Sequence, residues 1–142
     1  MNKKTDNTCI FCKINNGEIP SSTIYEDDDF KVILDISPAS KGHAVILPKN
    51  HAANIFELPD DDAEKIFKVA RKCAAAMTKV LQCDGINILQ NNGECAGQTV
   101  FHLHVHLIPR YENDAVNIKW KPLAPPENAA ALAEQIKAAI HD

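Results

Sequence analysis

The stretch TVFHLHVHLIPR, residues 99–110, places three of the chain's six histidines at every second position among apolar residues. Side chains alternate between the two faces of a β-strand, so His102, His104 and His106 are expected to share one face. The residues between and beside them are apolar and are expected to face the core: Phe101, Leu103, Val105 and Leu107. The pattern therefore predicts a strand with one core face and one face for chemistry or a polar groove.

The spacing of the three histidines argues against one metal ion held by all of them. A strand rises about 3.3 Å per residue, which separates the Cα atoms of His102 and His106 by roughly 13 Å, whereas a metal–nitrogen bond is about 2 Å long. A straight strand offers at most two of these rings to one ion. A solvated histidine face is the simpler alternative, but it requires the alternation to be accidental. We therefore expect different roles for the three rings.

Further strands are indicated before this stretch. The segment TIYEDDDFKVILDI (23–36) reads as two β-rich runs joined by an acidic turn at 27–29, GHAVILPK (42–49) as a third strand and GINILQ (85–90) as a fourth. The histidine run itself is expected to be a strand over 100–109. Because hairpin-like strands alternate with long helices, the expected fold class is α+β with a mainly antiparallel sheet.

Two helices are predicted. The longer one spans 63–81 and follows three aspartates at 60–62, which are expected to supply caps and favourable charge at its N-terminus. Its apolar stripe consists of Ile66, Val69, Ala70, Cys73, Met77, Val80 and Leu81. The second helix lies in APPENAAALAEQIKAAI (124–140), begins at its prolines and is expected to be a packing helix. Its apolar face consists of Leu132, Ile136 and Ile140.

Composition and charge exclude several classes of function. The net charge is −4, the sequence pI is about 5.8 and no long basic run is present, so no footprint for a DNA or RNA duplex is visible. The N-terminus lacks the apolar segment of a signal peptide, and nowhere do 18 apolar residues follow one another. We therefore expect a cytoplasmic protein with no membrane partner, and its 142 residues are expected to form a single domain.

The cysteines indicate metal or thiolate chemistry rather than a disulfide framework. Five cysteines are an odd number, and Cys9 and Cys12 have the Cys-x2-Cys spacing of a zinc knuckle. A lone pair of this kind lacks two further ligands nearby, and two buried thiols are the simpler alternative. His51 and His102 are available as partners.

Three stretches together resemble the histidine triad (HIT) superfamily, whose members act on the α-phosphorus of nucleotides. GQTVFHLHVHLIPR (97–110) resembles the signature of that superfamily, in which histidines alternate with apolar residues. The segments at 9–51 and at 84–100 (DGINILQNNGECAGQTV) resemble its bacterial, Hint-like members. The resemblance covers about residues 9–110, whereas the C-terminal loop and helix at 111–142 fall outside it.

The resemblance implies the architecture in more detail. The whole chain, 1–142, would be a single HIT domain with a mainly antiparallel five-stranded sheet, one long helix and a C-terminal helix. It also implies a homodimer in which two sheets join into one continuous sheet. The long apolar stripe of the main helix equally suits a core within one chain.

The resemblance also assigns roles to single residues. His104 would be the nucleophile, His106 would contact phosphate oxygens or the leaving group, and His43 would be a fourth histidine near the triad. Asp35 would bind the ribose hydroxyls. The implied nucleotide-binding set is Ile10, Phe11, Ile14, Ile19, Ile33, Asp35, Ile36, Val45, Asn91, Gly97, Gln98, Thr99, His104 and His106. On residue chemistry alone, Asp35 equally suits a turn and the apolar positions equally suit a core, whereas for His43 a strand histidine packed for structural reasons is favoured.

For the metal, the resemblance implies a structural zinc ion in a closed Cys2His2 site. Its ligands would be Cys9, Cys12, His51 and His102, and no organic cofactor is expected. His102 would then be structural although His104, two residues further on, is catalytic.

The predicted function is that of a HIT-family hydrolase. It would cleave purine nucleoside phosphoramidates or dinucleoside polyphosphates through a nucleotidyl-histidine intermediate and release a nucleoside monophosphate such as AMP. Transferase relatives in the family carry glutamine where this chain has His106. The resemblance therefore favours hydrolysis over transfer to a sugar phosphate. Two alternatives remain open: a nucleotide-binding interaction protein with incidental catalysis, and a metal-dependent hydrolase that uses the histidine cluster.

Overall fold

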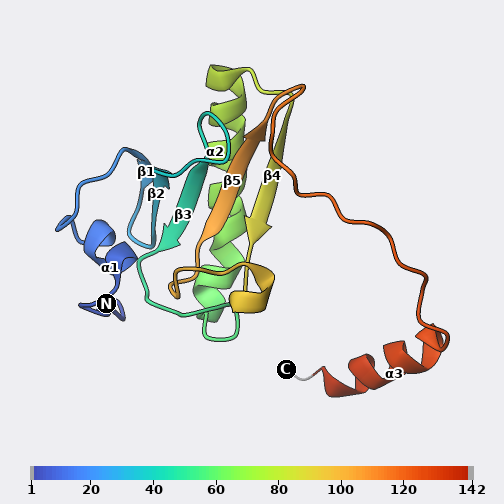
Figure 1. Cartoon of the computed structure of the whole chain (residues 1–142). Helices are drawn as coiled ribbons and strands as arrows, with labels where there is room; N and C mark the ends of the chain where they lie inside the picture. The colour runs from blue at the N-terminus through green and yellow to red at the C-terminus, as the bar shows by residue number, and fades with distance from the viewer. Residues whose placement is uncertain (1, 141–142) are drawn as a thin grey trace.

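Five strands form one antiparallel sheet in the computed structural model, which describes residues 2–140 (Figure 1). The strands are β1 (Thr23–Glu26), β2 (Phe30–Leu34), β3 (Ala44–Pro48), β4 (Gly85–Gln90) and β5 (Val105–Arg110), and they lie in the order β1-β2-β3-β5-β4. The helices are α1 (Ile10–Asn15), α2 (Asp60–Leu81) and α3 (Ala129–Ala139), and a short 3-10 helix, η1 (Glu94–Ala96), precedes β5. The predicted α+β class and five-stranded sheet are confirmed.

An aspartate closes the first hairpin. Asp27 Oδ1 accepts the backbone N–H groups of Asp29 and Phe30 at 2.8 and 2.7 Å. This is the local bonding that makes aspartate a favoured turn residue. Phe30 is fully buried as β2 begins, so the acidic run is the turn that the sequence predicts.

Helix α2 covers one face of the sheet (Figure 1). Its buried residues Ile66, Val69, Ala70, Cys73 and Met77 pack against side chains of β2, β3 and β5. Two predictions about this helix are wrong. Val80 exposes 80% of its surface, and no aspartate caps the helix, because Pro59 is the N-cap residue and no side chain bonds the first turn there. The aspartates at 60–62 still lie in the first turn, where negative charge complements the helix dipole.

The opposite face of the sheet carries α1 and the N-terminal segment. Because successive side chains alternate, Ile33 and Val45 point away from α2, and they pack against Ile14 of α1. His106 is the cross-strand partner of Val45, so its side chain points to the same face. The candidate catalytic residues therefore lie on the face that α2 leaves open.

Strand β5 is shorter than the strand predicted at 100–109. Strand pairing begins only at Val105. Before it, the backbone N–H of Leu103 donates to the carbonyl of Ala52 at 2.7 Å, which ties this segment to the loop after β3. Leu103 is still buried in the core, whereas Phe101 is half exposed. Consequently His102 and His104 precede the strand and only His106 lies on it.

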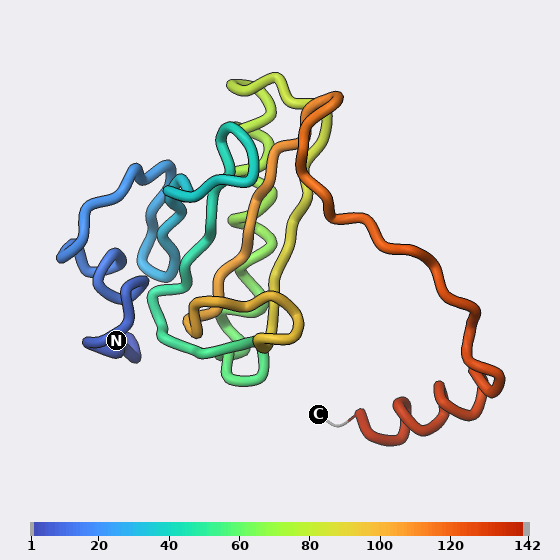
Figure 2. The backbone as a smooth tube through the Cα atoms, in the orientation of Figure 1, coloured from blue at the N-terminus to red at the C-terminus, as the bar shows by residue number. Residues whose placement is uncertain are grey.

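The C-terminal part of the chain leaves the sheet. Residues 111–128 run away from the domain on the β4 side and end in α3, which lies apart from the sheet (Figures 1 and 2). The helix begins at Ala129 rather than at the prolines, and none of its residues is buried. Of the predicted apolar face, Leu132 and Ile136 lie on the helix, whereas Ile140 is its extended C-cap residue. None of the three is buried within the described chain, which corrects the expectation of a packing helix. None of the helices in residues 2–140 is long and apolar enough to cross a membrane.

Candidate active site and metal centre

The ring of His104 is held through one of its nitrogens. Nδ1 lies 2.8 Å from the backbone carbonyl oxygen of His102. A carbonyl oxygen only accepts hydrogen bonds, so Nδ1 carries the ring proton and donates it. The neutral ring therefore has its free lone pair on Nε2, the atom that a nucleophilic histidine requires.

Two further histidines form a chain of hydrogen bonds. The backbone N–H of Ala39 donates to His43 Nδ1 at 2.9 Å, so the proton of neutral His43 is on Nε2. His43 Nε2 lies 2.9 Å from His106 Nδ1 and donates to it. His106 then carries its own proton on Nε2. The chain leaves His106 with an N–H that no other histidine takes, a geometry suited to donating a hydrogen bond to a phosphate oxygen or a leaving group.

Burial keeps these three rings neutral. It lowers the pKa of His104 and that of His43 below the usual 6.5. It also lowers the pKa of His106 to about 4, and the neighbouring His104 and His43 add to this effect. At neutral pH the site therefore holds a free base at His104 and an N–H donor at His106 without net charge on either ring.

Asp35 lies beside this chain. Its Oδ2 is 3.7 Å from His43 Nε2, while its Oδ1 accepts the backbone N–H of Ser37 at 2.8 Å. The carboxylate therefore closes a turn and also lies next to the histidines, so the two roles considered from the sequence are compatible. The neighbouring Ile36 is 95% exposed.

A loop at 91–99 leads from β4 to the histidine segment. Gly93 and Gly97 have φ angles of 91° and 96°, a left-handed conformation that favours glycine. The amide of Asn91 lies against Gly97, since a Cβ atom at that glycine would meet Asn91 Nδ2 at 3.4 Å. Within the described residues, neither the N–H nor the hydroxyl of Thr99 has a hydrogen-bond partner in the protein. This loop therefore offers unpaired donors immediately before the histidines.

Gln98 holds the same loop in shape. Its Nε2 donates to the carbonyls of Ala53 and Val100 at 2.6 and 3.1 Å, and its Oε1 accepts the N–H of Gly93 at 2.8 Å. The side chain is buried. The sequence predicts a nucleotide contact for Gln98, whereas its bonds within the protein give it a positioning role in the loop.

The apolar residues predicted to contact a base fall into two groups. Ile14, Ile33 and Val45 are buried together, and Phe11 and Ile19 pack against them. Ile10 is 47% exposed. The buried group lies on the same face of the sheet as His106, so it can form a wall beside the histidines while it also serves as core.

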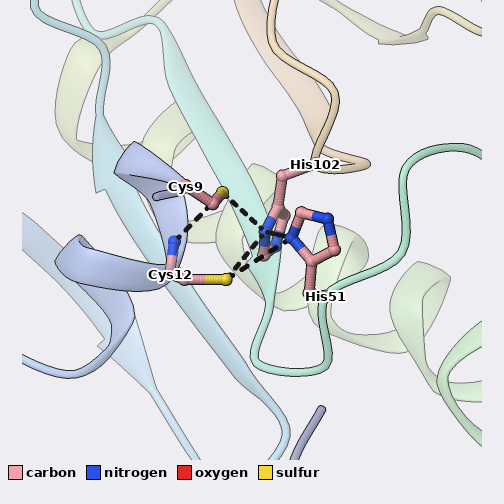
Figure 3. A group of neighbouring side chains, drawn as sticks. All are labelled: Cys9, Cys12, His51 and His102. Atoms are coloured by element: carbon pink, nitrogen blue, oxygen red, sulfur yellow. Dashed lines mark hydrogen bonds between the residues drawn. The ribbon is translucent and has the colours of Figure 1, made fainter. Parts of the chain in front are cut away.

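The four predicted metal ligands converge in space, as Figure 3 shows. Cys9 Sγ lies 3.4 Å from His102 Nδ1, Cys12 Sγ lies 3.4 Å from His51 Nδ1, and the two Nδ1 atoms are 3.2 Å apart. Ligands of a tetrahedral zinc ion, with Zn–S near 2.3 Å and Zn–N near 2.05 Å, lie about 3.6 Å apart for sulfur and nitrogen and about 3.3 Å apart for two nitrogens. The geometry of the cluster is therefore compatible with zinc.

Hydrogen bonds around the cluster also suit a metal. His102 Nε2 donates to the Pro48 carbonyl at 2.8 Å, which leaves the lone pair of its Nδ1 facing the thiols. The N–H of Cys12 donates to Cys9 Sγ, and the N–H of Asp6 donates to Cys12 Sγ, both at 3.4 Å. Without a cation, burial raises the pKa of Cys12 to about 11. A bound metal ion would supply the charge that favours the thiolate there.

The comparison with known proteins agrees with this arrangement. The HIT domain family matches residues 16–113. The chain belongs to the HIT family. Its sequence is similar to that of an adenosine 5'-monophosphoramidase of Schizosaccharomyces pombe, with 41% identity over 136 residues that cover 94% of this chain and 98% of the relative. This relationship confirms the prediction of a HIT-family hydrolase.

Two solved structures are similar to this chain in fold, and one of them contains zinc. A protein from Streptococcus mutans superposes with a TM-score of 0.91 and 45% identity, covering 96% of this chain and 88% of that one. A zinc-bound histidine triad family protein from Mycobacterium smegmatis superposes with a TM-score of 0.74 and 36% identity, covering 92% and 97% of the two chains. The zinc in the second protein is in line with the donor set found here.

In this HIT domain, α1 connects the Cys2His2 cluster with the candidate catalytic rings. Cys9 is the N-cap residue of α1 and Cys12 lies within it. Between them, Phe11 places its ring 5.0 Å from that of His104 and 5.9 Å from that of His102, edge to face in both cases. The segment that supplies two thiols therefore also supplies a side wall for the candidate nucleophile.

Sequence reasoning missed several residues of this HIT site. The N–H of Ala39 sets the tautomer of His43, and Asn15 Nδ2 donates at 3.0 Å to the same Pro48 carbonyl that orients His102. No sequence signal identifies a backbone N–H as a partner. Asn15 lies at the end of a helix of only six residues. The N-cap residue of this helix is a cysteine, which is not one of the residues that usually mark a helix start in a sequence.

Proposed function

We propose that this HIT-family hydrolase cleaves nucleoside phosphoramidates by attack of His104 Nε2 on the α-phosphorus, and that AMP derivatives are its substrates. The tautomer of His104 carries the proposal, because a lone pair on a buried, neutral Nε2 needs no deprotonation before attack. The similarity to a protein named adenosine 5'-monophosphoramidase supports phosphoramidates as the substrate class and AMP as the nucleotide part.

The nucleotide would lie on the face of the sheet opposite α2. Its purine would occupy the slot beside Ile14, Ile33 and Phe11, and Asp35 would accept the ribose hydroxyls. The unpaired N–H and hydroxyl of Thr99, together with Asn91, would hold the phosphate oxygens as charge shifts onto them. These contacts fix the phosphorus in front of His104, and positioning supplies most of the catalysis in transfers of this kind.

The reaction proceeds in two balanced steps. In the first, His104 Nε2 forms a bond to phosphorus and the bond to the leaving amine breaks. The amine takes a proton from solvent as it leaves, and the N–H of His106 Nε2 donates a hydrogen bond to it. In the second, water attacks phosphorus and gives one proton back to solvent, while His106 Nε2 keeps its own proton and bonds the phosphate oxygens. The bond from His104 to phosphorus then breaks, and AMP and the starting state are released. His43 keeps Nδ1 of His106 occupied during both steps.

The Cys2His2 cluster has a structural role in this proposal. Cys9, Cys12, His51 and His102 would hold a zinc ion whose four coordination positions are all filled by protein, so it supplies folding energy rather than a reactive water. The ion would fix α1, and with it Phe11, against the sheet.

The proposed assembly is a homodimer joined at β4. This strand has an open edge, because β5 is its only neighbour among the described strands. Ile88 on β4 and Phe67 on α2 are 42% and 66% exposed, so the edge is flanked by apolar surface. Pairing of β4 with β4 of the second copy would provide hydrogen-bond partners for the backbone groups at this edge and would continue the sheet into the partner.

The experiment is a rapid, acid-free quench of the protein mixed with adenosine 5'-phosphoramidate. We expect an adenylyl adduct on the peptide that contains His104, together with release of AMP, and neither in a His104→Ala variant that still binds AMP. Turnover that survives in His104→Ala but stops after chelation would favour a metal-dependent hydrolase. Neither adduct nor AMP from wild-type protein that binds AMP would favour a nucleotide-binding interaction protein.

A further inference from the structure

A second apolar surface lies on the α2 side of the sheet, opposite to the nucleotide site. A groove of about 330 Å³ runs between α2 and the β1–β2 hairpin, and its walls include Ile24, Leu34, Met77 and Val80. Ile24, Leu34 and Val80 are 44%, 37% and 80% exposed, although such residues normally lie inside a domain. Val80 is the one residue of the predicted apolar stripe of α2 that is almost fully exposed.

The groove lacks the polar groups that a metabolite needs. Its polar side chains are Lys72, whose ammonium lies 5.9 Å above the ring of Tyr25, and Tyr25 itself, whose hydroxyl already donates to Asp27. Small-molecule sites combine apolar walls with a few convergent polar groups. This groove instead suits apolar side chains presented by another protein segment.

Helix α3 carries exposed apolar side chains that could fill such a groove. Leu132 and Ile136 lie four residues apart on one face of the helix, and they are 44% and 57% exposed. Ile140, the C-cap residue directly after the helix, is 72% exposed. A helix of 11 residues is marginal in water without tertiary packing. The chain thus contains an apolar helical face without a cover and an apolar groove without an occupant.

The course of the arm, residues 111–128, favours a second copy as the partner. The arm leaves the end of β5 and passes outward on the β4 side, whereas the groove lies beside β1 at the other edge of the sheet (Figures 1 and 2). A copy that pairs along the β4 edge would lie on the side to which the arm extends. The arm carries α3 away from its own groove.

A solved relative supports this extended course. Residues before α3 make up about 90% of the chain, 128 of 142, yet the superposition on the Streptococcus mutans protein covers 96% of it with a TM-score of 0.91. The alignment with that structure therefore extends into α3.

We propose that α3 of one chain docks its apolar face into the groove between α2 and the β1–β2 hairpin of a second copy, and that the second copy returns the same contact. Leu132 and Ile136 lie against Val80, Ile24 and Leu34 of the partner copy. The contact is reciprocal and closed, as a two-fold dimer requires. It couples the C-terminal arm to the assembly and leaves the nucleotide face of each sheet free.

A double variant, Val80→Cys with Ile136→Cys, tests the contact in the full chain. After mild oxidation we expect a covalent dimer on a non-reducing denaturing gel, and peptide mass should map the link to positions 80 and 136. A link from position 136 to the native Cys73 counts as the same result, because Cys73 lines the same groove. The matched control is Arg71→Cys with Ile136→Cys, since Arg71 is exposed on the side of α2 opposite to Val80 and should give no link between positions 71 and 136.

Two outcomes of this experiment overturn the proposal. A monomer closed by an internal link between positions 80 and 136 would show that α3 folds back onto its own groove. Absence of any link between α3 and the groove, with the control equally unlinked, would leave the groove to another partner.

A second variant does not depend on cysteine chemistry. Ile136 is more than half exposed within its own chain, so Ile136→Asp should be silent for an undocked helix. If α3 docks, the variant should melt at a lower temperature than wild type, and amide exchange should accelerate both in α3 and in residues 72–81. A variant that matches the wild type in both measurements contradicts the docking.

Discussion

Replacing His43 by phenylalanine tests whether a hydrogen bond between two histidines serves catalysis. Phenylalanine keeps a flat ring of similar size in a position where His43 is only 5% exposed, but it cannot donate to His106 Nδ1, 2.9 Å away. His106 then retains a buried acceptor without a partner, and nothing fixes which of its nitrogens carries the proton. The substitution therefore changes the proton donor without removing it.

The size of the effect follows from that one lost bond. A buried polar group left unpaired costs about 1–3 kcal/mol. If this cost falls on the transition state, kcat/KM should decrease by about 5- to 150-fold at 25 °C. The affinity for AMP should stay near that of the wild type, because His43 bonds to His106 and to the backbone of Ala39 rather than to the ligand.

The assay measures AMP release from adenosine 5'-phosphoramidate under steady-state conditions, with AMP affinity determined by calorimetry. His43→Gln is the matched control, since its amide can donate to His106 and should recover part of the lost rate. Activity as low as that of His104→Ala would refute the reasoning, because it would place His43 on the reacting atoms. A loss confined to AMP affinity would refute it as well, because His43 would then only hold the loop at 35–43.

Three further predictions address the metal, the pH dependence and the backbone. Cys12→Ser should reduce bound zinc well below one ion per chain, and it should also weaken AMP binding because α1 carries both Cys12 and Phe11. Elemental analysis measures the zinc content and calorimetry the AMP affinity, with Cys83→Ser as the control. The pKa of His106 is about 4 in the folded protein, whereas the usual value is 6.5. As pH falls, His106 is therefore protonated in the unfolded chain before it is protonated in the folded one. The free energy of unfolding should consequently decrease as pH falls from about 6.5 to 4. The melting temperature of His106→Gln should therefore fall less steeply than that of wild type in this window, and equal slopes would contradict the shift. Gly42→Ala should lower the free energy of unfolding by more than about 1 kcal/mol, because φ is +90° and the new Cβ would lie 2.4 Å from Leu81 Cδ1; in denaturant titrations Gly85→Ala, with its nearest atom at 3.9 Å, should stay close to wild type.

Much of the sheet could be predicted because its signals are local. Alternating apolar residues and the turn aspartate Asp27 define the β1–β2 hairpin, and the strand at 85–90 follows from its β-branched residues and flanking glycine. The apolar stripe of α2 predicts its buried face for the same reason. Val80 is the exception, because the side of the helix that it occupies borders a groove rather than the sheet.

Other features depend on contacts between distant segments and left no local signal. The expected strand at 100–109 stops short at Val105, because Leu103 bonds to the loop at Ala52 instead of to a neighbouring strand. Helix α1 is too short for a periodic pattern and is capped by a thiol. The ligands Cys9, Cys12, His51 and His102 come from three separate segments, so only the resemblance to a family could group them before the fold was known.

The departure from a regular strand accounts for the different roles proposed for three histidines at equal spacing. An unbroken strand would place all three rings in one row at similar depth. Because pairing starts at Val105, His102 turns toward the cysteines and is fully buried, with its carbonyl left free of the ladder. That carbonyl accepts the proton of His104 Nδ1. His106, held on the strand opposite Val45, instead meets His43. One irregular turn of backbone thus separates the proposed metal ligand His102 from the proposed hydrogen-bond donor His106. Through the His102 carbonyl, it also leaves the free lone pair of His104 on Nε2.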